Sequence, residues 1–259
     1  MAGQEIDKKA KTVELKAKSK REFFLLHGYT GSPTDFNNLG KYLNKRFNAN
    51  VKIIRLKGHG EKIENIDSLD YKDFLIQAEE ELKKEIAKGM EIIIGGISIG
   101  SFIALQLSTK YPVHGIISVS NPYRYRLFTG ILSFFEPIVF KKHWKKPIPD
   151  YEKGLRKNAF YYDTNLRGVK IIKQGKKEVD RILNKVKAPC LIVHVLDENI
   201  FHEKGARLIR DKIKSKIKKI YYFRENGKAS HNPFYAINHK KVNLVIGNFV
   251  EDNKLFKIK

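Results

Sequence analysis

A serine framed by glycines lies at residues 96–100, which read Gly-Ile-Ser-Ile-Gly. Three isoleucines at 92–94 precede it, as expected for a strand buried on both faces of a parallel sheet, and a helix-compatible stretch follows. A tight turn from strand to helix exposes a serine hydroxyl, and its flanking glycines let the chain pass close to itself. We therefore interpret Ser98 as a nucleophile for acyl transfer. The alternative is a glycine-rich turn that holds a serine by chance.

Two backbone N–H groups are predicted to stabilise an oxyanion near this serine. Ile99 follows it directly, at the start of the predicted helix, where N–H groups have no partner within the helix. The second group belongs to Tyr29, because the apolar strand 22–26 runs into a His-Gly-Tyr-Thr-Gly loop at 27–31. A glycine-containing loop after an early strand is where serine hydrolases on α/β sheets place their other oxyanion donor.

An acid and a histidine that could activate the serine follow two later strands. The strand at 189–195 ends in Leu-Asp-Glu, and we predict that Asp197 is the acid, with the adjacent Glu198 as the alternative. The strand at 219–223 is followed by a loop that contains His231, the predicted base. The histidine would accept the serine proton, and the acid would fix the imidazole tautomer, so the two form a charge-relay pair.

Other histidines fit the role of base less well. His202 precedes the last strand, and His239 falls inside the predicted closing helix. His27 and His59 each lie in a glycine-containing loop, and we interpret both as structural histidines that brace those loops.

The order of predicted elements indicates an α/β protein with a mostly parallel, doubly wound sheet. Strands and helices alternate between residues 22 and 120 and resume after 188, which is typical of βαβ units. Residues 123–185 lack clean strand patterns and are rich in aromatic residues. We predict a core of residues 1–122 and 186–259, with 123–185 inserted as a helical cap or lid. The three candidate triad residues then follow three different strands at the carboxyl edge of the sheet, where α/β proteins place their sites.

These motifs together resemble the α/β-hydrolase superfamily, and more narrowly the bacterial carboxylesterase and monoacylglycerol lipase group. The matching segments are residues 27–33, 56–60, 96–100 and 189–197, and His231. The resemblance implies a serine hydrolase that needs no cofactor and no metal. Relatives commonly have Phe where Tyr29 stands and Met where Ile99 stands; both positions act through backbone N–H groups, so the oxyanion hole is expected to persist.

Composition restricts the class of protein further. With 259 residues and 42% hydrophobic residues, the chain can bury a large core as one domain or two. The single cysteine, Cys190, excludes a disulfide framework within the chain. The first residues lack the apolar segment of a signal peptide, and no run of about 18 apolar residues occurs. We expect a soluble, cytoplasmic protein; its oligomeric state does not follow from the sequence.

The formal net charge of +23 is high. It could attract nucleic acid, an anionic membrane surface or acidic substrates. Because lysines are scattered along the chain and no nucleic-acid module is visible, we expect no nucleic-acid partner and interpret the charge mainly as compositional. Weak association with an anionic membrane surface would suit a lipid-like ester.

Three functions fit the sequence to different degrees. The first is hydrolysis of short- or medium-chain carboxylic esters, monoacylglycerols included, through an acyl-enzyme on Ser98. The second is a thioesterase, acyltransferase or cinnamoyl-type aryl esterase that uses the same triad. The third is a non-catalytic protein that binds a lipid surface or a partner; a complete triad argues against it.

Overall fold

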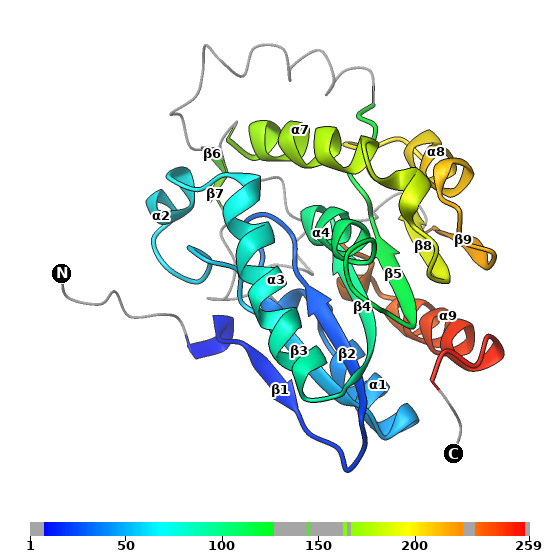
Figure 1. Cartoon of the computed structure of the whole chain (residues 1–259). Helices are drawn as coiled ribbons and strands as arrows, with labels where there is room; N and C mark the ends of the chain where they lie inside the picture. Colours follow the sequence, from blue (N-terminus) through cyan, green and yellow to red (C-terminus); the bar gives the residue numbers. More distant parts are fainter. Residues whose placement is uncertain (1–7, 127–143, 146–162, 165–166, 225–230, 257–259) are drawn as a thin grey trace.

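Seven strands form one sheet in the order β1-β3-β2-β4-β5-β8-β9 (Figure 1). All neighbours pair in parallel except β1, which runs antiparallel to β3. The computed structural model describes residues 8–126, 144–145, 163–164, 167–224 and 231–256. The strands of this sheet are β1 (Val13–Leu15), β2 (Arg21–Leu26), β3 (Asn50–Ile54), β4 (Glu91–Ile97), β5 (Gly115–Val119), β8 (Cys190–Val195) and β9 (Lys218–Phe223).

Helices cover both faces of the sheet. One face carries α3 (Tyr71–Ala87), α4 (Ile99–Leu107), α7 (Arg167–Asp180) and α8 (Lys204–Lys212), and the other carries α1 (Leu39–Phe47) and α9 (His239–Asp252) (Figure 1). The short elements are α2 (Glu64–Asp67) and the 3₁₀ helices at Lys8–Ala10, Pro33–Phe36, Leu183–Lys185 and Pro233–Tyr235. This arrangement confirms the predicted α/β class.

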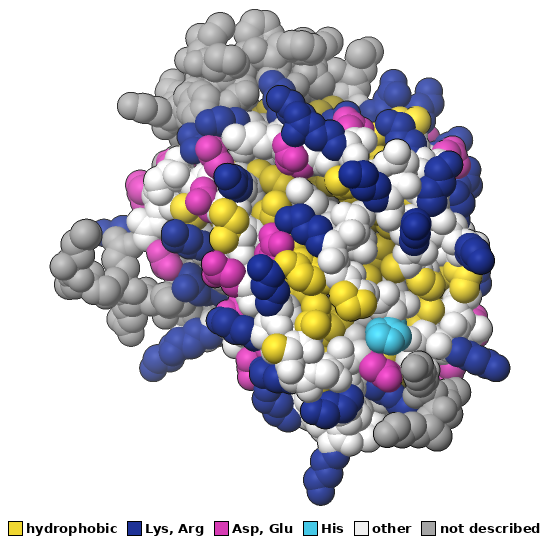
Figure 2. Space-filling view, viewed as in Figure 1, with side chains coloured by type: hydrophobic (Ala, Val, Ile, Leu, Met, Phe, Trp, Pro, Cys, Tyr) yellow, Lys and Arg dark blue, Asp and Glu magenta, His cyan; other side chains and the backbone are white. Residues whose placement is uncertain are grey.

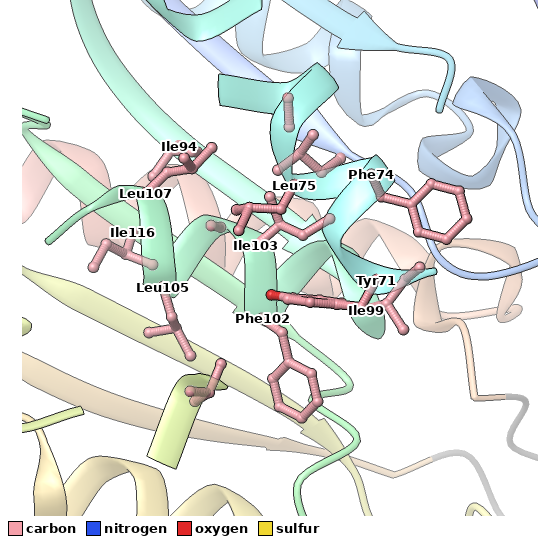
Figure 3. Packing of buried hydrophobic residues seen from close by; sticks show 14 of the residues in the cluster. Tyr71, Phe74, Leu75, Ile94, Ile99, Phe102, Ile103, Leu105, Leu107 and Ile116 are labelled. Atoms are coloured by element: carbon pink, nitrogen blue, oxygen red, sulfur yellow. The ribbon is translucent and has the colours of Figure 1, made fainter. Parts of the chain in front are cut away.

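Helix α4 is buried along its whole length, which explains why its sequence is apolar on every side. It lies over the sheet, where Ile94 and Ile116 face it, and α3 and α7 pack on its outer side (Figure 3). Phe102 and Tyr71 belong to the same cluster of buried side chains. Ser98, the residue directly before this helix, is therefore attached to a densely packed element, which suits a side chain that must be placed precisely.

Only parts of the predicted cap lie within the described residues. The segments β6 (Trp144–Lys145) and β7 (Asp163–Thr164) pair antiparallel, and α7 is a helix within the residues predicted to form a helical cap. The buried residues of α7 are Gly168, Ile171, Gly175 and Val179, a helical spacing that faces α3 and α4. The other residues of the predicted cap lie outside the described residues, and the domain boundaries stay a prediction.

The surface is basic without a single dominant patch on the face in Figure 2, where Lys and Arg side chains are spread among acidic and apolar ones. Within the described residues, no helix has the length and apolarity needed to cross a membrane.

Candidate active site

The turn at Ser98 has the strained backbone that the sequence predicts. Ser98 joins β4 to α4 with φ 53° and ψ −120°, a conformation that non-glycine residues rarely adopt. A Cβ at Gly96 would lie 2.1 Å from the carbonyl carbon of Gly100, and one at Gly100 would lie 2.2 Å from the Leu26 oxygen. Both positions therefore require glycine, because larger residues would push the helix away from the sheet.

A buried hydrogen-bond network supports the turn from below. Ser101 Oγ donates to the Ser98 carbonyl at 2.5 Å, and Ser98 N–H donates to the Val119 carbonyl at 3.0 Å. Asn121 Nδ2 is 2.9 Å from Ser101 Oγ and 3.3 Å from the hydroxyl of Ser118, a residue of β5. The network links the turn to the neighbouring strand β5. It could not be predicted from the sequence, because only Ser101 lies near the Gly-Ile-Ser-Ile-Gly motif.

The loop after β2 passes directly beside the serine. A Cβ at Gly28 would lie 3.3 Å from Ser98 Cβ. The next residue, Tyr29, has its ring against α7, since a Cβ at Gly168 would lie 2.7 Å from Tyr29 Cε1. The structure thus places the loop that contains Tyr29 beside Ser98, and Ile99, the first residue of α4, follows Ser98 directly.

Histidines brace this loop, as predicted. His27 Nε2 accepts from Leu56 N–H at 3.0 Å, while Nδ1 lies 2.9 Å from the Gly28 carbonyl. His59 Nε2 accepts from Thr30 N–H at 3.1 Å, and its Nδ1 lies 3.0 Å from the Lys57 carbonyl. Each ring must be neutral, with its proton on Nδ1, to satisfy both contacts. Their nitrogens are used by the backbone, which argues against a catalytic role.

Burial of these rings makes stability depend on pH. Burial lowers the pKa of His27 and, more strongly, of His59, and it lowers that of His194 on β8 to about 4. In the unfolded chain these three histidines bind protons near pH 6.5. Below that pH the unfolded chain holds more protons than the folded chain, so the free energy of unfolding falls with acidification. Glu22 has the opposite effect on stability. Burial and the nearby Glu85 charge raise its pKa to about 7 in the folded protein. As the pH falls, the folded protein therefore binds this proton before the unfolded chain does, and the uptake stabilises the fold.

We therefore expect Glu22→Gln to lose stability more steeply than the wild type between pH 7.5 and 5.5. The variant keeps the destabilising proton uptake by the unfolded histidines but lacks the compensating uptake by Glu22. For each titrating group, the free energy of unfolding changes by at most about 1.4 kcal/mol per pH unit. Urea unfolding at several pH values measures it; equal slopes in both proteins would contradict the assignment to Glu22.

The predicted base lies beside an acid, but not the predicted one. His231 Nδ1 is 2.6 Å from Glu198 Oε2. Glu198 is 2% exposed, and the described residues offer no hydrogen-bond partner to His231 Nε2, which is buried. A carboxylate on Nδ1 holds the proton there and leaves Nε2 as the acceptor, which is the tautomer that a general base needs.

The acid that His231 contacts is Glu198, which the sequence offered as the alternative to Asp197. Strand β8 ends at Val195, the next two residues form the turn, and Glu198 is the first buried residue after it. Asp197 is half-buried, and its Oδ1 lies 3.8 Å from Arg224 Nε. Both candidate acids follow β8, Asp197 within the turn and Glu198 directly after it.

Hydrogen bonds to an early segment of the chain hold His231 in place. Asn232 Nδ2 donates to the Asp35 carbonyl at 2.9 Å, and Asn37 Nδ2 donates to the Phe234 carbonyl at 2.9 Å. The Tyr235 hydroxyl donates to the Thr34 carbonyl. These bonds join the histidine loop to the segment that follows the Tyr29 loop.

The other histidines lie elsewhere. His202 is paired with Glu203, and its Nδ1 accepts from Lys204 N–H. His239 begins α9 and contacts the Ala236 carbonyl through Nδ1. Among the described residues, no group of three or more His, Cys, Asp or Glu side chains is placed to hold a metal ion.

The sheet order, the strained serine turn and the late histidine paired with an acid after β8 define an α/β-hydrolase. The chain belongs to the serine aminopeptidase S33 family, which it matches over residues 17–231.

Relatives and solved structures agree with this class. A carboxylesterase of Bacillus subtilis is 24% identical over 211 residues, covering 78% of this chain and 82% of its own. A thermostable monoacylglycerol lipase of a Bacillus species is 29% identical over 97 residues, covering 37% and 38%. Among solved structures, one from a study of the metagenome-derived lipolytic enzymes LipS and LipT has a TM-score of 0.82 at 19% identity, covering 96% and 100%. The monoglyceride lipase of Saccharomyces cerevisiae has a TM-score of 0.75 at 14% identity, covering 93% and 90%.

Proposed function

We propose that the protein is a carboxylic ester hydrolase that acts through an acyl-enzyme on Ser98. His231 takes the serine proton through Nε2 as the hydroxyl attacks the ester carbonyl. Glu198 holds the imidazole and stabilises the imidazolium that forms. The observation that carries the proposal is the 2.6 Å contact between His231 Nδ1 and the buried Glu198 Oε2. It occurs in a chain whose turn at Ser98 has a strained backbone and a glycine two residues to each side.

The backbone N–H groups of Tyr29 and Ile99 are assigned to the oxyanion. Gly28 packs on Ser98, so the next N–H along the loop lies close to the nucleophile, and the N–H of Ile99 begins helix α4. Each donor would lower the barrier by roughly 3 kcal/mol. The alcohol leaves with the proton from His231. Water then attacks the acyl-enzyme, with His231 again as the base, and the carboxylic acid is released from Ser98.

Short- and medium-chain acyl esters, including monoacylglycerols, are the proposed substrates. The support comes from the relatives, which are named as a carboxylesterase and as monoacylglycerol lipases. The family description also names an aminopeptidase, and amide cleavage would use the same acyl-transfer steps. Thioesters and cinnamoyl-type esters are the remaining alternatives on this site.

A substrate series tests the proposal. We expect hydrolysis of p-nitrophenyl esters from acetate to laurate and of 1-monoacylglycerols, at higher kcat/KM than amino-acid p-nitroanilides or acyl thioesters of matched length. A fluorophosphonate probe should label the peptide that contains Ser98. Cleavage of anilides alone would assign the chain to peptide chemistry, and a folded protein that neither turns over nor labels would be non-catalytic.

A further inference from the structure

The acid loop, residues 196–202, has no regular structure of its own, yet it must place Glu198 to within hydrogen-bond distance of His231. The carboxylate is held by little else: Oε1 is buried without a hydrogen-bond partner among the described residues, and Oε2 contacts His231. The position of the carboxylate is therefore set by the backbone of the loop rather than by bonds to the carboxylate itself.

One side chain binds that backbone on both sides of Asp197. Arg126 Nε donates to the Glu198 carbonyl at 2.8 Å, and its Nη2 donates to the Leu196 carbonyl at 2.9 Å. A guanidinium is planar, and its donors have a fixed spacing, so it holds two carbonyls at a fixed separation. The clamp fixes the turn from which the Glu198 side chain is directed inward.

The backbone around Arg126 is tied to the same loop. Arg126 N–H donates to the Ile200 carbonyl at 2.9 Å, and His202 N–H donates to the Arg124 carbonyl at 2.8 Å. Between these bonds, Tyr125 and Phe201 form a β-bridge with ring centroids 4.9 Å apart. The Phe201 ring also lies 5.2 Å from the His231 ring. The segment that contains Arg126 thus contacts the backbone of Glu198 and also the Phe201 ring, which packs on His231.

We infer that Arg126 is a positioning residue of the active site: its guanidinium fixes the acid loop so that the carboxylate of Glu198 meets Nδ1 of His231. The inference rests on the proposed function, because it needs His231 and Glu198 to act together. The side-chain bonds described above join Arg126 to the backbone of the acid loop, so it acts on the reaction through the position of Glu198.

The test is a double-mutant cycle on ester hydrolysis. We expect Arg126→Ala to lower kcat by about 10- to 100-fold with little change in KM, since small displacements of a catalytic pair have effects of this size. In a Glu198→Gln background the same change should have almost no further effect, because there is no carboxylate left to position. Arg124→Ala, which removes an exposed guanidinium two residues away, should match the wild type.

Two further readouts separate positioning from general destabilisation. Guanidinium chloride at millimolar concentration should restore part of the lost kcat in Arg126→Ala, and the low-field proton signal of the His231–Glu198 bond should weaken in that variant. If Arg126→Ala does not fold, Arg126→Lys, which reaches one carbonyl at a time, should fold and show an intermediate kcat.

The outcomes are distinct. Unchanged kcat in Arg126→Ala, or an equal loss in both backgrounds, would overturn the inference while leaving the proposed function intact. Full activity in Glu198→Gln would instead overturn the acid assignment within the proposed function, and the inference with it.

Discussion

Ser98→Ala is expected to abolish ester hydrolysis, lowering kcat by about 10⁶-fold, which is the typical loss when a triad nucleophile is removed. Without the hydroxyl no acyl-enzyme can form, and turnover must depend on direct attack by water in the remaining oxyanion site. The steady-state rate on the best p-nitrophenyl ester, together with loss of fluorophosphonate labelling, measures this effect.

Ser108→Ala is the matched control for this substitution. Ser108 follows the other end of helix α4, where its hydroxyl bonds the Leu105 carbonyl at 2.7 Å, so the same chemical change is made away from the turn. We expect wild-type kcat in this variant. Retained activity in Ser98→Ala at equal purity would mean a different nucleophile, and the assignment of the site would fail.

The second large effect distinguishes the two adjacent acids. Glu198→Gln should lower kcat by about 10⁴-fold, the scale of losing the orienting carboxylate in a serine triad. The amide preserves shape but removes the charge that stabilises the imidazolium, and its NH₂ group can face His231 and favour the wrong tautomer. The kcat at saturating ester, with thermal unfolding to confirm folding, is the measurement.

Asp197→Asn makes the same chemical change at the neighbouring position and should alter kcat by less than about threefold, because it is Glu198 that contacts Nδ1 of His231. The reverse pattern, a large loss in Asp197→Asn and a small one in Glu198→Gln, would restore the pairing expected from the sequence and contradict the structure.

Periodicity and turn chemistry predicted most of this fold. Alternating strands and helices gave the parallel sheet, and glycines around Ser98 gave the turn, because both are local properties that one segment of chain determines. The sequence predicted a helical cap over residues 123–185 but no bounds for helix α7 within it. This helix is basic, and its buried positions include two glycines, which carry no hydrophobic signal.

The acid that contacts His231 could not be chosen from the sequence for a related reason. The end of β8 can be predicted from its apolar run, but the number of turn residues before the chain re-enters the protein depends on contacts with distant segments. The carbonyls of Leu196 and Glu198 bind Arg126, which lies about seventy residues earlier in the chain. Neither Asp197 nor Glu198 carries a local signal of that contact, so a choice between adjacent acids required the tertiary structure.

The bonds between the histidine loop and residues 34–37 connect positions 197 residues apart, near opposite ends of the chain. Contacts of such long sequence separation form late in folding, because the loop they close is costly in entropy. During synthesis, the nucleophile and both oxyanion segments leave the ribosome well before the base. The growing chain therefore remains without hydrolytic activity until its last strand and helix have docked, and recovery of activity on refolding should coincide with the final step rather than with formation of the sheet.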